Sequence, residues 1–122
     1  MKNLKAFRAA ALAVILLGIV HLIATPFVLS MFSNLNKMQL LTFGYMFVST
    51  GVALVFLGWI QYYTLKLSVL EKFNWVIIKT SVTTFTLFGI GAVASMWDNP
   101  FAYISLLLAV MEWYFYYKIR TK

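Results

Sequence analysis

The 122-residue chain has no cysteine, a single histidine and only three acidic residues. Without cysteine it cannot form a disulfide, a cysteine-ligated metal site or a catalytic thiol. One histidine cannot by itself build a metal or haem site within one chain. The sequence also contains neither a phosphate-binding glycine loop nor a nucleophile–histidine–acid set. These absences leave little from which to build an enzyme, so we predict a protein without demonstrable catalysis.

Hydrophobic residues make up 63% of the chain, and charged residues only 11%. A soluble domain of this size needs a wetter exterior. The apolar residues form four long stretches, at about 9–32, 40–65, 73–96 and 100–117. Each is close to the ~20 residues that cross a bilayer core of ~30 Å. We therefore predict a single all-α domain over residues 1–122, an integral membrane four-helix bundle.

Positive charge is distributed unevenly between the two ends of this predicted bundle. Only Lys37 flanks the stretches on the side away from the termini. Eight cations flank them on the side of the termini: Lys2, Lys5, Arg8, Lys66, Lys72, Lys118, Arg120 and Lys122. Because cytoplasmic loops are enriched in Lys and Arg, we expect both termini in the cytoplasm, as in a bacterial cytoplasmic-membrane protein. No basic patch interleaves with exposed aromatics, so nucleic acid is not an expected partner despite the net charge of +7.

A lone acid, Glu112, lies inside the last apolar stretch. At a rise of ~1.5 Å per residue it is ~18 Å from Pro100, and Lys79 is ~10 Å from Lys72, so both fall at a similar depth. Charges inside a membrane are costly and usually face the bundle interior. We expect either a structural pair between Glu112 and Lys79 or a proton or cation site. In a further alternative Lys79 extends to the headgroups and leaves Glu112 unpaired and protonated.

A candidate polar cluster inside the membrane therefore consists of Glu112, Lys79, His21, Thr83 and Ser105. Ser105 shares a helix face with Glu112, and Thr83 shares one with Lys79. Small and polar side chains are typical of the surfaces where membrane helices meet. His21 is interpreted as a neutral side chain bonded to a neighbouring helix, as a proton relay to Glu112, or as a contact for a ligand head group.

Glycines in the second stretch recur every seven residues, at Gly44, Gly51 and Gly58. They lie on one stripe, where a partner helix can approach closely. Gly91 and Ser95 form a second pair of small residues at helical spacing, in the third stretch. Gln61, near the end of the second stretch, is expected to make an interhelical hydrogen bond.

The segment Gly18-Ile19-Val20-His21-Leu22, followed by Thr25-Pro26, resembles small four-span bacterial membrane proteins, including the broad DoxX-like group. The resemblance covers size, span count and this short motif, and it implies no functional residue. The chain is also similar to small multidrug-resistance transporters in length, span count and a lone membrane glutamate. Those transporters carry the glutamate in their first span, whereas Glu112 is in the last.

These observations predict an accessory or scaffold subunit, or a binder of a lipophilic molecule between helices. The main alternative is a proton-coupled small-molecule transporter that acts as a homodimer through Glu112. A quinone-using partner of a membrane oxidoreductase is a third reading, although the sequence offers no cofactor ligands for it. The bilayer is the expected surroundings, and a homodimer or a larger membrane complex is the expected assembly. The sequence leaves any cofactor unspecified.

Overall fold

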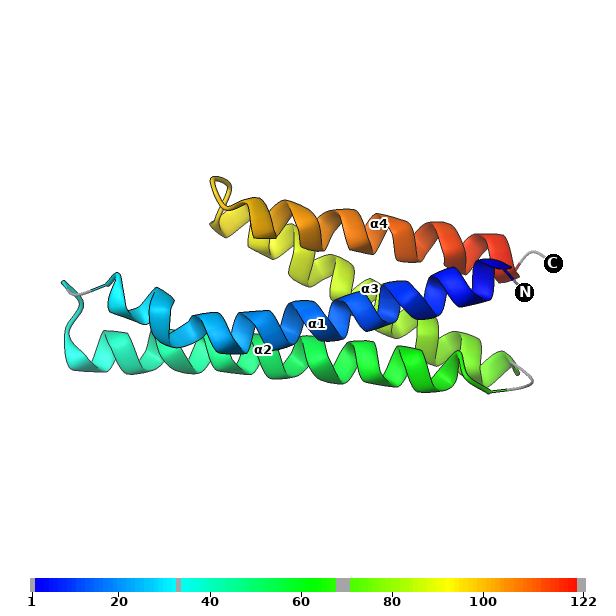
Figure 1. Cartoon of the computed structure of the whole chain (residues 1–122), viewed down its shortest axis with the longest axis horizontal. Helices are drawn as coiled ribbons and strands as arrows, with labels where there is room; N and C mark the ends of the chain where they lie inside the picture. Colours follow the sequence, from blue (N-terminus) through cyan, green and yellow to red (C-terminus); the bar gives the residue numbers. More distant parts are fainter. Residues whose placement is uncertain (1, 33, 68–70, 121–122) are drawn as a thin grey trace.

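A computed structural model describes residues 2–32, 34–67 and 71–120, which form four helices and no strand. The helices are α1 (Lys2–Ser30), α2 (Lys37–Thr64), α3 (Lys72–Ser95) and α4 (Pro100–Arg120). Consecutive helices run in opposite directions, and both termini lie at the same end of the molecule (Figure 1). The all-α fold predicted from the apolar stretches is confirmed, although α1 begins at Lys2 rather than near residue 9.

The bundle consists of two antiparallel hairpins, α1–α2 and α3–α4, which lie side by side (Figure 1). Each helix packs against two others: α1 and α3 both contact α2 and α4. The pairs α1 with α3 and α2 with α4 occupy the diagonals and have no close backbone contact in the described part of the chain. At the end away from the termini, the α1–α2 hairpin extends beyond the turn between α3 and α4.

Local sequence explains where α2 and α4 begin. The backbone N–H of Gln39 donates to Asn36 Oδ1 at 2.9 Å, and that of Asn36 donates to Gln39 Oε1 at 3.1 Å. This reciprocal arrangement is a capping box, which satisfies two N–H groups at the start of α2. Before α4, the N–H of Phe101 donates to Asn99 Oδ1 at 3.0 Å, and Pro100 occupies the first helical position, where no N–H is needed.

The glycine stripe of α2 lies against α1, and the two backbones approach closely there. A Cβ atom added to Gly58 would lie 2.7 Å from the carbonyl oxygen of Ala11. One added to Gly18 would lie 2.8 Å from the carbonyl oxygen of Gly51. Gly44 continues the contact against a leucine side chain of α1. Because only hydrogen fits between the backbones, the seven-residue spacing allows α1 and α2 to pack as one tight hairpin.

Two hydrophobic layers fill the half of the bundle near the termini. The terminal core layer consists of Phe7, Leu65, Ile78, Val82 and Tyr116. The middle core layer consists of Val14, Leu54, Phe85 and Ala109. Both layers combine side chains from the α1–α2 hairpin with side chains from the α3–α4 hairpin. The two hairpins are therefore held together at these two levels.

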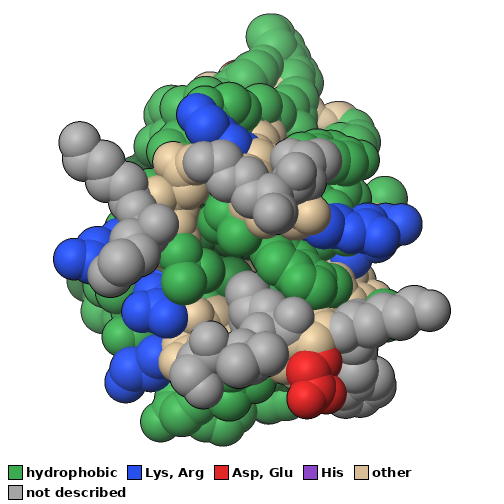
Figure 2. Space-filling model, turned by 90° about the vertical axis from the view of Figure 1, so that its right-hand side faces the viewer, with side chains coloured by type: hydrophobic (Ala, Val, Ile, Leu, Met, Phe, Trp, Pro, Cys, Tyr) green, Lys and Arg blue, Asp and Glu red, His purple; other side chains and the backbone are tan. Residues whose placement is uncertain are grey.

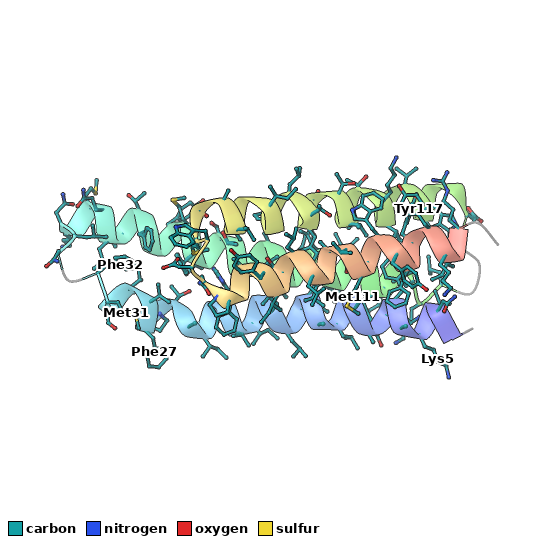
Figure 3. All side chains as sticks on the ribbon, turned by 90° about the horizontal axis from the view of Figure 1, so that it is seen from above. Lys5, Phe27, Met31, Phe32, Met111 and Tyr117 are labelled. Atoms are coloured by element: carbon teal, nitrogen blue, oxygen red, sulfur yellow. The ribbon has the colours of Figure 1, made fainter. Side chains whose placement is uncertain are left out.

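Large apolar side chains cover the outside of the bundle. Phe27 is 67% exposed and Met31 is 78% exposed, and Figure 3 shows both pointing away from the helices. Within the described part of the chain, three helical segments are long and apolar enough to cross a membrane: Asn3–Ser30, Lys37–Thr64 and Asn74–Ser95. The fourth predicted span, α4, is not among these three, since its second half carries Glu112 and a group of tyrosines.

The end that holds both termini is rich in positive charge. Figure 2 faces this end and shows Lys and Arg side chains around its edge. Arg8 donates from Nε and Nη2 to the carbonyl oxygen of Leu65, at 2.8 Å and 2.5 Å, and so ties the start of α1 to the end of α2. Of the eight cations predicted at this end, Lys122 lies outside the described residues, and so do the side chains of Lys2 and Lys72.

Candidate functional site

The structure places the candidate polar residues in three separate locations. Glu112 is completely buried at a level between the two core layers. Lys79 and Thr83 lie on the exposed face of α3. His21 and Ser105 line a cavity farther from the termini. The five residues therefore do not form one cluster.

Glu112 bonds to Gln61 across the centre of the bundle. Gln61 Nε2 donates to Glu112 Oε2 at 3.2 Å, and both side chains are 0% exposed. Because α2 and α4 occupy a diagonal, this bond links the two hairpins through the core. It confirms the interhelical hydrogen bond predicted for Gln61. The other two oxygens of the pair, Gln61 Oε1 and Glu112 Oε1, are buried without a hydrogen-bond partner.

The predicted ion pair between Lys79 and Glu112 is wrong. The buried face of α3 consists of Ile78, Ser81, Val82 and Phe85. Lys79 follows Ile78 directly, and the helical rotation of ~100° per residue turns it to the exposed surface. Thr83 lies on the same exposed side, where its hydroxyl donates to the Lys79 carbonyl oxygen at 2.9 Å. The face that we predicted from the sequence is thus displaced by about one residue from the face that packs.

The middle core layer separates Glu112 from the cavity. Its four side chains are hydrophobic and buried, and Glu112 is not one of the residues that line the cavity. A proton relay from His21 to Glu112 would have to cross this layer, in which no side chain can carry a proton. Glu112 is therefore better explained as a link between the hairpins than as a transport site.

Beyond the middle core layer the hairpins diverge (Figure 1) and enclose a cavity of about 320 Å³, which all four helices line. We call it the interhairpin cavity. Its walls are mainly aromatic and aliphatic, and they include Phe47, Phe85 and Phe88. Its polar lining residues are His21, Thr50, Asn99 and Ser105. Here the side chains of the four helices leave a hollow between them that a small ligand can occupy.

A second hollow of about 550 Å³ lies on the side of the bundle, between α2 and α3. We call it the lateral groove. It shares six lining residues with the interhairpin cavity: His21, Phe47, Thr50, Phe88, Ala92 and Met96. Gly91 and Ser95, predicted as a helix-packing pair, line this groove instead, and a Cβ atom added to Gly91 would meet nothing within 4 Å.

His21 lies where the cavity and the groove adjoin. Its half-buried ring stacks on Phe47, with ring centroids 4.9 Å apart and planes at 10°. Nε2 is buried and has no hydrogen-bond partner. We predicted a hydrogen bond from His21 to a neighbouring helix, and Nε2 makes no such bond. His21 instead contacts α2 through the stacking of its ring on Phe47. The Thr25 hydroxyl donates to the His21 backbone carbonyl at 2.9 Å, a bond within α1.

Among the residues that the structure describes, neither hollow is lined by an Asp, Glu, Lys or Arg side chain. Within residues 2–32, 34–67 and 71–120, no three His, Cys, Asp or Glu side chains gather as a metal site requires. Transfer of an ion from water into a lining without a counter-charge has a desolvation free energy on the order of several kcal/mol. The cavity is therefore suited to an uncharged, largely apolar molecule.

The sequence singled out His21 and Ser105 but not the other cavity residues. Phe47, Phe88 and Thr50 have no sequence feature that separates them from the apolar residues around them. In a helix that is hydrophobic on all sides, the face that meets a cavity looks like the face that meets lipid. The divergence of the two hairpins is what makes these residues face the cavity rather than lipid.

Comparison of the chain with protein-family models, with curated proteins and with solved structures found no match. The resemblance of the segment around His21 to the DoxX-like group therefore stays a prediction. The residues of the interhairpin cavity are the basis on which a function can be proposed.

Proposed function

We propose that this chain is a four-span integral membrane protein that binds a neutral lipophilic molecule in the interhairpin cavity. Three of its helices have the length and apolarity of membrane spans. We place α4 in the membrane as well, because it packs against α1 and α3 and exposes Leu107 and Val110 on its outer side. The concentration of Lys and Arg at one end supports cytoplasmic termini, as expected for a bacterial cytoplasmic membrane.

The observation that carries this proposal is the cavity itself. It lies between two hairpins that are well packed near the termini and separated at the other end. Its walls offer aromatic and aliphatic surface from all four helices and no charged side chain. Ligand sites between the helices of a bundle typically combine such apolar walls with a few polar groups.

We favour a binding protein over the other functions predicted from the sequence for two reasons. A proton-coupled transporter would need its acid beside the transported molecule, and Glu112 does not line the cavity. A scaffold subunit would need no hollow between its helices, whereas this bundle holds one of about 320 Å³ lined by all four.

The test uses para-octylphenol as the probe and the purified protein in lipid nanodiscs. Ala92 lines both the cavity and the lateral groove, and Ala94 lies two residues further along α3 on its exposed side. Ala92→Phe should fill the shared space and remove most of the bound probe, measured by equilibrium dialysis and corrected for uptake by empty nanodiscs. The matched variant Ala94→Phe should bind as the wild type does.

Two results would contradict the proposal. The first is that wild-type nanodiscs take up no more probe than empty ones. The second is that Ala92→Phe and Ala94→Phe bind equally, because binding would then occur on the lipid-facing surface rather than between the hairpins.

A further inference from the structure

The polar atoms on the cavity wall indicate the kind of group that a ligand must carry. A hydroxyl has one hydrogen to donate and two lone pairs that accept. On the cavity wall, the hydroxyl hydrogens of Thr50 and Ser105 are used within their own helices. The Thr50 hydroxyl donates to the Met46 carbonyl oxygen at 2.8 Å, and the Ser105 hydroxyl donates to the Ala102 carbonyl oxygen at 2.6 Å. Both oxygens are left with lone pairs and no hydrogen to offer.

The other polar lining residues are His21 and Asn99. The neutral His21 ring carries one N–H and one lone pair, its Nε2 is buried without a partner, and the ring stacks against Phe47. Asn99 lies at the turn before α4, where its Oδ1 accepts from Phe101 N and its Nδ2 lies 4.0 Å from Met96 Sδ. The donors on the wall are therefore confined to His21 and Asn99, whereas Thr50 and Ser105 offer acceptors only.

We propose, resting on the proposed function, that the ligand is a neutral lipophile bearing a hydroxyl or N–H group that donates to Thr50 Oγ1 or Ser105 Oγ. Its apolar body packs against the phenylalanines of the cavity. A ligand that carries only acceptors, such as an ether or an ester, would face these oxygens lone pair to lone pair. At these two oxygens the cavity therefore distinguishes alcohols, phenols and amines in their neutral form from their alkylated counterparts.

Charge and size support the same ligand class. The absence of charged side chains from the lining disfavours fatty-acid anions and quaternary amines. A volume of about 320 Å³ accommodates a small ring with a short alkyl chain. The adjoining lateral groove can hold a longer chain that extends toward the lipid.

The test compares para-octylphenol with para-octylanisole, its methyl ether, which has nearly the same shape but no hydrogen to donate. Each affinity is measured in nanodiscs and corrected for uptake by empty nanodiscs. A net hydrogen bond in a protein interior corresponds to a preference of about twofold to tenfold. We expect wild-type protein to bind the phenol more tightly than the ether by this factor.

Two near-isosteric variants identify the acceptor. In Thr50→Val or in Ser105→Ala, the phenol should lose its preference while the affinity for the ether stays unchanged. Both hydroxyls bond to their own helix, so the backbone hydrogen bonds of α2 and α4 remain in the variants, and the melting temperature checks this. A preference that survives in the double variant Thr50→Val/Ser105→Ala would overturn the assignment of the acceptor.

The outcomes separate this inference from the proposed function. Equal affinity of the wild type for both probes, with both lost in Ala92→Phe, would overturn the inference and leave the binding function standing. Failure of both probes to bind above the empty-nanodisc level would overturn the proposed function itself. A tighter affinity for the ether than for the phenol would also contradict the inference.

Discussion

At the scale of single residues, the Gln61–Glu112 bond is a buried polar contact that joins the two hairpins in the packed half of the bundle. It lies between two hydrophobic layers, and both side chains are fully buried. A buried polar group that loses its partner costs about 1–3 kcal/mol. The pair should therefore behave as a unit, in which removal of one member costs more than removal of both.

We expect Gln61→Leu to lower the free energy of unfolding in detergent by about 1–3 kcal/mol, because it leaves Glu112 buried without its donor. The double variant Gln61→Leu/Glu112→Leu should regain much of that loss, and Glu112→Gln should cost less than Gln61→Leu because it keeps an amide at the site. Lys79→Gln serves as the control and should change little, since Lys79 is exposed. The account is wrong at this point if the double variant is less stable than Gln61→Leu alone.

The sequence was sufficient to predict that Glu112 is interior and that Gln61 bonds to another helix, since an unpartnered polar group among acyl chains is costly. It was insufficient to identify the partner. Charge and depth favour Lys79, because opposite charges attract and the two residues fall at a similar depth. The orientation of α3 about its own axis decides between them. No single polar face reveals that orientation, because polar residues occur around most of the helix: Lys79, Thr80, Ser81, Thr83, Thr84 and Thr86.

At the scale of helices, the glycine stripe determines how closely α1 and α2 pack. The spacing of Gly44, Gly51 and Gly58 predicted a close approach but left the partner open, since a stripe of small residues fits another helix of the same chain or of a second copy. The structure places α1 against it, with Ala11 and Gly18 as the small residues opposite. Short connections between consecutive helices favour such neighbouring pairs.

Gly58→Leu should destabilise the protein in detergent by about 1–3 kcal/mol or more, as overpacking of a well-filled interface does. The added Cβ would lie 2.7 Å from the Ala11 carbonyl oxygen and 2.9 Å from the Ile15 backbone nitrogen, and neither atom can move without the whole of α1. Gly91→Leu is the matched control, because a Cβ there meets nothing within 4 Å. Thermal unfolding that is equally affected by both substitutions would show that the stripe does not govern packing.

At the scale of the whole molecule, the bundle is asymmetric along its length. The half near the termini is packed in two layers, and the other half is hollow between the hairpins. Composition gives no sign of this difference, since apolar residues fill both halves of every helix. The cavity arises from the angle between the hairpins, which depends on contacts distant in sequence and was not predictable from the chain.

The distribution of charge predicts the orientation in the membrane. Lys37 is the one cation flanking the spans at the end away from the termini. Reporter fusions placed after residue 36 and at the C-terminus should therefore report opposite sides of the membrane, with the C-terminus in the cytoplasm. Reporters that appear on the same side would require an even number of membrane crossings between them, and so would contradict a bundle in which α2, α3 and α4 all span the membrane.

The most direct measurement of the central claim is photolabelling in native membranes with a diazirine-bearing alkylphenol, followed by peptide mapping. If a lipophile binds between the hairpins, the label should concentrate on cavity residues such as Phe88 and Met96, and competition with para-octylphenol should remove it. Ala92→Phe should suppress the same labelled peptides. Labelling spread over outward-facing side chains such as Leu16 and Val110, without competition, would show that the molecule only dissolves in the lipid around the bundle.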